Sequence, residues 1–273
     1  MLEQLKYQNH LNEVIEFGKE GIYVDASDLR DYQWTATKKN ERIAALNRKV
    51  STRKLPIRIV CKSDAEGTAI RNKLFEVTEK DVLALQHGRI IIGDYYFKCF
   101  VTQSKKKDFL ASKRLMQVDL TLTTDFPYWT KETVTAFSPQ AGTFARNADF
   151  PFDYPYDYHT NILNRSLVNT GFASCNFRMV IFGPCYNPSI SIAGHTYQVN
   201  CSVEESEYLT IDSVAKKIFL TENDGSVTNV FKLRNRESYI FEKIPPGSNE
   251  VAWDGSFGFN IILLEERSEP KWT

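Results

Sequence analysis

The sequence predicts a mainly β protein made of two β domains. Apolar and polar residues alternate strictly in several stretches of the first half, and strand-like segments follow one another at roughly ten-residue intervals in the second half. The chain has 273 residues, 42% of them hydrophobic, which suffices for one large core or two ordinary ones. These observations favour short antiparallel strands in both halves.

The first domain is expected to be mostly sheet. Apolar side chains occupy every second position in residues 57–61, 95–101 and 116–122, the pattern of strands that are buried on one face. Gly93-Asp94 separates two such runs and suits a hairpin turn.

One helix is predicted to interrupt this sheet. Ser63 and Glu66 have the spacing of a capping box. The residues that follow carry a mainly apolar stripe at helical spacing, so the helix is expected to cover one face of the sheet. A separate short helical turn is expected at 79–85.

Residues 35–56 carry seven basic side chains against Glu41 alone. Charge by itself favours a solvated hairpin or loop tip. The alternative is an arm that docks on an acidic neighbour, with Glu76, Glu79 and Asp81 as candidate partners. The basic residues are Lys38, Lys39, Arg42, Arg48, Lys49, Arg53 and Lys54.

Periodicity disappears after residue 127, so we place a linker at 136–149 between domains at 1–135 and 150–273. The charges change sign in the same region. Residues 1–135 hold 23 basic and 18 acidic side chains, and the remainder of the 34 of each kind gives 11 and 16. This step from +5 to −5 suggests two units with different surfaces.

The second domain is predicted to be a β-sandwich or jelly roll. Asp224-Gly225 and Pro245-Pro246-Gly247 mark reversals between its strands. The expected strands are 177–183, 196–203, 207–213, 216–222, 228–234, 239–244, 250–255 and 257–266.

The stretch FPFDYPYDYH at 150–159 alternates aromatic residues with proline and aspartate. Closure of the sandwich by an edge strand is the favoured interpretation, because two prolines confine the strand to an edge. The alternative is a glycan-stacking surface made by Tyr154, Tyr156 and Tyr158. A metal site at Asp153, Asp157 and His159 is weaker, since no fourth ligand lies nearby.

The sequence contains no nucleophile elbow, phosphate-binding loop or zinc-protease motif. We therefore expect no enzymatic activity, cofactor or metal. Five widely spaced cysteines favour free thiols. Neither a signal peptide nor a membrane segment is expected.

Several stretches together resemble the distal tail proteins of phages and prophages with long non-contractile tails. They are GIYVD…DYQW, GRIIIGDYYFKCFVTQS with MQVDLTLTTDFPYW, FPFDYPYDY, and NPSISIAGHTYQV…LTIDS…IPPGSNEVAW…EERSEPKW. The resemblance covers nearly the whole chain, and its motifs are structural rather than catalytic.

The resemblance implies a tail-tube-like N-terminal domain, a sheet or sandwich with one packed helix, and a galectin-like C-terminal sandwich. It implies a homo-hexameric ring at the virion tail tip, assembled in the cytoplasm of the bacterial host. The ring would join the major tail tube protein to tail-tip, baseplate and receptor-binding proteins, and DNA would pass through it without sequence-specific contacts. A carbohydrate-binding adhesion module of such a tail is the alternative.

Overall fold

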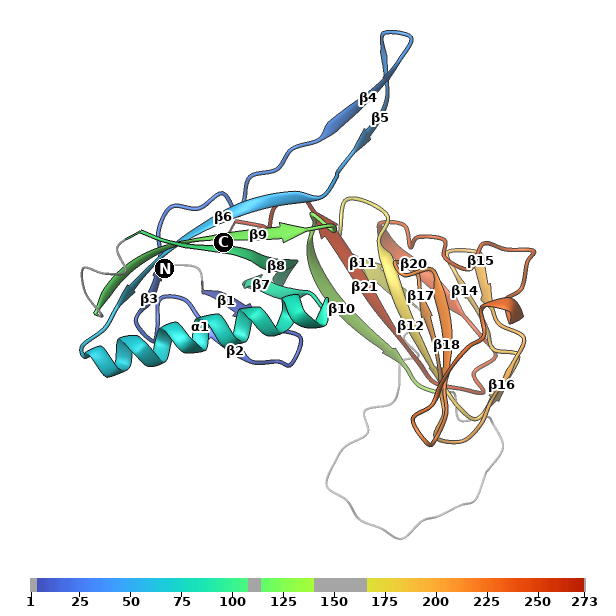
Figure 1. The fold of residues 1–273 in the computed structure, drawn as a ribbon. Helices are drawn as coiled ribbons and strands as arrows, with labels where there is room; N and C mark the ends of the chain where they lie inside the picture. The colour runs from blue at the N-terminus through green and yellow to red at the C-terminus, as the bar shows by residue number, and fades with distance from the viewer. Residues whose placement is uncertain (1–3, 108–113, 140–165, 273) are drawn as a thin grey trace. The chain divides into compact units, whose positions relative to one another are not determined.

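The computed structural model describes residues 4–107, 114–139 and 166–272, which form two compact units (Figure 1). Unit 1 comprises Met1–Lys131 together with Glu266–Thr273, and unit 2 comprises Glu132–Glu265. The predicted domains differ from these units, because the C-terminal segment returns to unit 1. There the Arg30 guanidinium donates to the Pro270 carbonyl at 2.9 Å and stacks on the Trp272 ring at 3.7 Å.

Unit 1 combines two antiparallel sheets that share one long strand, β8. One sheet has the order β2-β1-β7-β8-β10 and the other β3-β6-β9-β8. A register shift between Val101 and Gln103 lies where β8 pairs with β9. The elements are β1 (Leu5–Gln8), β2 (Val14–Glu16), β3 (Ile22–Val24), β4 (Thr35–Lys39), β5 (Arg42–Asn47), β6 (Ser51–Val60), α1 (Asp64–Ala84), β7 (Gly88–Ile92), β8 (Tyr95–Lys106), β9 (Leu115–Thr124) and the first residues of β10 (Trp129–Phe137).

The helix α1 begins at the predicted cap. The Ser63 hydroxyl accepts a hydrogen bond from the Glu66 amide at 3.2 Å, and Ile70, Leu74 and Val77 are buried in the core of unit 1. The expectation of a separate turn at 79–85 is wrong. One helix runs to Ala84, since no proline interrupts the 21-residue segment.

Unit 2 is a β-sandwich, so the mainly β prediction is confirmed for both units. One layer has the order β19-β18-β17-β12-β21-β10 and the other β11-β20-β14-β15, with a small β13-β16 pair beside them. Besides the end of β10, the strands are β11 (Ser166–Asn169), β12 (Asn176–Phe182), β13 (Cys185–Tyr186), β14 (Ser189–Ile192), β15 (His195–Gln198), β16 (Ser202–Val203), β17 (Tyr208–Asp212), β18 (Lys217–Thr221), β19 (Val227–Asn229), β20 (Gly247–Ala252) and β21 (Phe259–Arg267).

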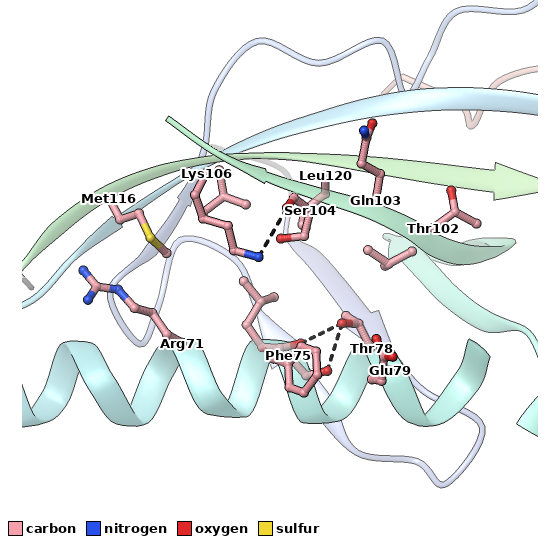
Figure 2. Close-up of a pocket in the computed structure, with 13 residues that line it drawn as sticks. Arg71, Phe75, Thr78, Glu79, Thr102, Gln103, Ser104, Lys106, Met116 and Leu120 are labelled. Carbon is pink, nitrogen blue, oxygen red and sulfur yellow. Dashed lines mark hydrogen bonds between the residues drawn. The ribbon is translucent and has the colours of Figure 1, made fainter. Parts of the chain in front are cut away.

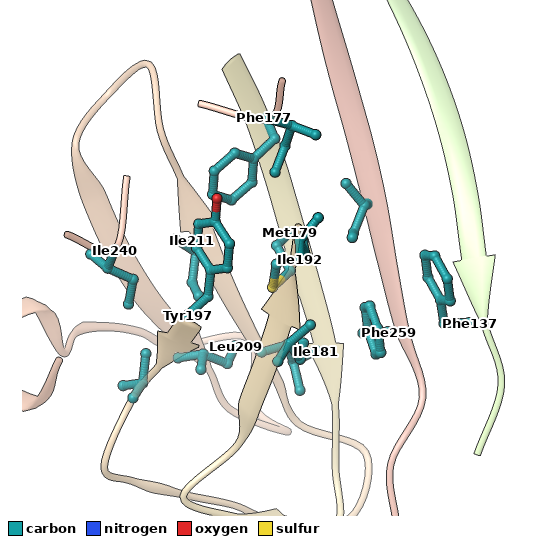
Figure 3. Close-up of a cluster of buried hydrophobic side chains, with 14 of the residues drawn as sticks. Phe137, Phe177, Met179, Ile181, Ile192, Tyr197, Leu209, Ile211, Ile240 and Phe259 are labelled. Atoms are coloured by element: carbon teal, nitrogen blue, oxygen red, sulfur yellow. The ribbon is translucent and has the colours of Figure 1, made fainter. Parts of the chain in front are cut away.

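The core of unit 2 lies between its layers, where alternate residues of each strand meet (Figure 3). Phe177 and Met179 of β12 are fully buried, as is Phe259 of β21. The Phe177 ring meets Tyr197 of the opposite layer edge to face at 5.2 Å. Aromatic pairs of this kind stabilise the packing beyond the area they bury.

Three predicted strands of unit 2 differ from the structure. The segment 196–203 is divided between β15 and β16, which belong to different sheets. Residues 239–244 form a turn, in which the Glu242 amide donates to the Tyr239 carbonyl and only Ile244 bridges to Cys175. The prolines that follow have no N–H group to extend a ladder. The segment 228–234 is a strand only through Asn229, followed by a 3-10 turn at Phe231–Leu233.

Candidate functional site

The basic segment of unit 1 forms a two-stranded hairpin, β4–β5, that projects away from both sheets (Figure 1). Its turn residues, Asn40 and Glu41, have φ angles of 49° and 60°. Two positive φ values in a two-residue turn match the twist of a hairpin. Every residue of both strands is exposed.

The hairpin exposes apolar as well as basic groups. Lys38 pairs with Ile43 and Ala36 with Leu46, so these four share one face. Ile43 is 64% and Leu46 54% exposed. A two-stranded hairpin without further support is marginally stable in water. The exposed face of this hairpin therefore combines apolar and basic side chains.

The seven basic residues do not form one surface. Lys38, Lys39 and Arg42 lie exposed at the hairpin tip, while Lys49 and Lys54 are exposed at or beyond its base. The remaining two, Arg48 and Arg53, point into unit 1, as their contacts show. The basic segment thus has two parts. Its tip is exposed, and its base contains one half-buried and one buried arginine.

Arg53 is only 5% exposed. Its Nη1 donates to the main-chain carbonyls of Asp28 at 2.8 Å and Leu29 at 3.0 Å, and also to that of Asp31. Its guanidinium lies 5.0 Å from the Phe97 ring centroid. Burial lowers the pKa of Arg53 from its usual value. This side chain anchors the loop that precedes the hairpin.

Arg48 lies among three aromatic rings at the hairpin base. Its guanidinium is 4.7 Å from the ring centroid of Trp34, 4.8 Å from Tyr128 and 5.5 Å from Tyr32. Its Nη1 donates to the Pro127 carbonyl. Partial burial lowers the pKa of Arg48 as well. Cation–π contacts of this kind hold the base of the hairpin in place.

One of the three acidic partners suggested for the arm is already engaged inside unit 1. The Asp81 side chain is fully buried and accepts from the Tyr7 hydroxyl and from the main-chain amide and Nδ1 of His10. Burial raises the pKa of Tyr7. A Cβ atom on Gly88 would lie 2.2 Å from the Asp81 carboxylate, so only glycine fits there. Asp81 is therefore a structural residue. The prediction that it is an acidic partner for the basic segment is wrong, because its carboxylate is buried and already bonded.

Glu76 is exposed on α1, and Glu79 lines a groove between α1 and strands β8 and β9 (Figure 2). The groove has a volume of about 510 Å³ and a mainly apolar lining that includes Met116. Its Thr78 hydroxyl and Lys106 ammonium donate to main-chain carbonyls. The groove is therefore apolar, with Glu79 at its wall.

The outer face of unit 2 carries a shallow polar pocket of about 360 Å³. Ser189 and Ser191 of β14 line it together with Asn187 and Asp254. The Trp253 ring also lines it, and the indole N–H donates to the Phe257 carbonyl at 3.0 Å. The Trp253 ring is partly buried and packs on the core of unit 2, where its centroid lies 5.2 Å from that of Phe259.

The aromatic stretch at 150–159 lies outside the described residues, and with it Tyr154, Tyr156, Tyr158, Asp153, Asp157 and His159. In the rest of the chain, as far as the structure describes it, no group of three or more His, Cys, Asp or Glu side chains is placed to hold a metal ion. No described helix is long and apolar enough to cross a membrane.

All five cysteines carry free thiols. Burial raises the pKa of Cys99 to about 12 and that of Cys185 to about 11. Because the thiolate is the reactive form, a raised pKa makes these two thiols less reactive at neutral pH.

The fold is similar to that of solved phage baseplate and adsorption-hub proteins. A chain of the phage P2 baseplate in its activated conformation with Ca matches with a TM-score of 0.64 at 12% identity, covering 99% of this chain and 100% of that chain. The same baseplate with Sr gives the same values. The Dit protein of phage SPP1, described as a paradigm of the hub of the adsorption apparatus in phages infecting Gram-positive bacteria, matches with a TM-score of 0.59 at 8% identity, covering 98% and 100%.

No family model matches the sequence, and no curated protein matches it. At identities of 8–12%, the structural matches show a shared fold over both units.

Sequence reasoning missed the buried arginines, although a signal was present. Arg53 has the same parity as Leu55, Ile57 and Ile59 in β6, and that parity faces the core. The bonding of Asp81 had no such signal, since its partner Tyr7 is 74 residues away.

Proposed function

We propose that this protein is a structural component of a phage tail tip, a distal tail protein that joins the tail tube to baseplate and host-recognition proteins. The observation that carries the proposal is the fold similarity to baseplate and hub proteins across both units and the full length of those chains. A likeness confined to one β-sandwich would have little weight, because sandwiches serve many functions.

In this proposal, unit 1 is the tail-tube-like, ring-forming domain and unit 2 the galectin-like one. Six copies close a ring through a heterologous contact in which the hairpin of one copy reaches the next. The exposed Lys38, Lys39 and Arg42 supply the positive charge, and Glu76 and Glu79 of the neighbour are the remaining acidic candidates.

The proposed partners are further copies of this chain, the major tail tube protein, a tail-tip or tail-associated protein and a receptor-binding protein. DNA would pass through the ring without sequence-specific binding. The role is non-enzymatic, located at the virion tail tip after assembly in the bacterial cytoplasm.

Electron microscopy of the purified protein, alone and with the tail tube protein, tests this function. We expect sixfold rings, formed either by the protein alone or on the end of the tube. Protein that stays monomeric and fails to bind the tube under all conditions would contradict the proposal.

A second candidate function is glycan binding by unit 2. The polar pocket beside Trp253 favours it, because aromatic stacking with hydrogen-bonding side chains suits sugar recognition. A glycan array probed with the full chain tests it. Binding that is lost in Trp253→Ala or in Tyr154→Ala would locate the site, whereas an array without signal would remove this candidate.

A further inference from the structure

The base of the hairpin borders a pocket of about 250 Å³ within unit 1. Three cationic side chains, Arg48, Lys49 and Arg53, line it together with the Ser51 hydroxyl. Asp28 and Asp31 lie on the same lining. The pocket is thus formed at the hairpin base by the residues that follow β5, the first residues of β6 and the loop at 28–33.

The residues that line this pocket carry four buried donors without a hydrogen-bond partner within the described part of the chain. They are Nε and Nη2 of Arg48, Nε of Arg53 and the Ser51 hydroxyl. Arg53 is itself 95% buried, as its 5% exposure shows. Buried polar groups in native proteins are almost always paired, so four orphaned donors on one pocket point to an acceptor from outside.

The carboxylates of Asp28 and Asp31 do not accept hydrogen bonds from these four donors. Arg53 binds the main-chain carbonyls of Asp28 and Asp31, not their carboxylates. The Asp28 carboxylate accepts from the main-chain amide of Lys54 instead. Neither Arg48 nor Arg53 forms an ion pair among the described residues. A buried and a half-buried guanidinium group without a bonded anion are unfavourable neighbours.

We propose that this pocket is a binding site for one oxyanion group, held by Arg48, Arg53 and Ser51. Guanidinium groups bind carboxylate, sulfate and phosphate through short charge-assisted hydrogen bonds, and a hydroxyl adds a further donor. The group has two potential sources. One is an acidic side chain of a second copy of this chain, which rests on the proposed ring, and the other is a free anion from solution.

Inorganic sulfate is the probe, titrated against sodium chloride of equal ionic strength by calorimetry and thermal unfolding of dilute full-length protein. We expect one sulfate per chain and a rise in Tm beyond that in chloride. Ser51→Ala should weaken binding by about three- to tenfold, the effect of one hydrogen bond. Arg48→Gln should abolish it.

Arg58→Gln is the matched control, because Arg58 is exposed on β6 and pairs with Asp25 away from the pocket. It should bind sulfate like the wild type. The proposal is overturned if the wild type shows no sulfate-specific heat or Tm shift, or if all four proteins bind sulfate equally. Ser51→Ala keeps the test valid if Arg48→Gln does not fold.

Repeating the sulfate titration on assembled protein distinguishes the two sources of the oxyanion. If a carboxylate of a second copy occupies the pocket, sulfate competes with it and dissociates the assembly at a lower ionic strength than chloride does. If the source is a free anion, sulfate binds dissociated and assembled protein with equal affinity. Either result supports the oxyanion site. A protein that binds sulfate but never assembles would refute the ring and leave the site intact.

Discussion

The tip and the base of the β4–β5 hairpin carry the same types of residue in opposite surroundings. At the tip, Lys38, Lys39 and Arg42 are exposed. At the base, Arg53 is buried with three carbonyl acceptors, and Arg48 lies among aromatic rings. One run of charge in the sequence therefore contains exposed side chains at the tip and buried or half-buried side chains at the base.

The position of a charged residue within a strand decides whether its side chain is buried or exposed. Arg53 alternates with Leu55 and Ile57 on the inner face of β6, whereas Lys54 lies on the outer face. A buried charge is retained only with hydrogen bonds that compensate its lost hydration. We expect substitutions to separate the two regions by their effects on stability and on assembly.

The largest effect on stability is expected for Arg53→Met. The change removes the donor to three main-chain carbonyls in a buried site, which should lower the free energy of unfolding by about 3–5 kcal/mol. Urea unfolding followed by circular dichroism measures it. Lys54→Gln, one position further along β6, is the control and should behave like the wild type. Equal stability of the two variants would show that the buried arginine contributes nothing.

Arg48→Gln should have an intermediate effect. The substitution removes cation–π contacts to Trp34, Tyr128 and Tyr32 and one hydrogen bond, so we expect a loss of about 1–2 kcal/mol. The same unfolding measurement checks it, and Arg48→Lys should recover part of the loss by keeping the charge. A glutamine variant as stable as the wild type would refute the aromatic cage as a source of stability.

Neutralising the tip should have the smallest effect. Lys38→Gln with Lys39→Gln should change the free energy of unfolding by less than about 0.5 kcal/mol, because exposed charges without ion pairs contribute little. A marked loss in the purified monomer would mean that the tip packs against its own chain.

The sequence predicted those parts of the fold that depend on local periodicity. Alternation in 95–101 and 116–122 corresponds to β8 and β9, and Ser63 caps α1 as expected. Residues 239–244 were expected to form a strand from the spacing of the strand-like segments, yet the adjoining prolines and the bond within the turn prevent a strand there.

The candidate site was predicted less completely, because charge counts do not report burial. The basic segment was identified, but the separation of tip from base depends on tertiary contacts such as Arg53 with the Asp28–Asp31 loop. The burial of Asp81 depends on Tyr7 and His10, which are more than 70 residues away. Contacts between residues so far apart in the chain do not affect the local periodicity of the sequence.

The most direct test of the central claim, that the exposed tip joins copies into a ring, is the molar mass of the charge-reversed protein. Light scattering after gel filtration should compare the wild type with the triple variant Lys38→Glu, Lys39→Glu and Arg42→Glu. The control carries Lys62→Glu, Arg89→Glu and Lys105→Glu, three exposed cations elsewhere in unit 1. We predict hexamers for the wild type and the control, dissociating as salt rises, and folded monomers for the tip variant. Hexamers of undiminished stability in the tip variant would contradict the account.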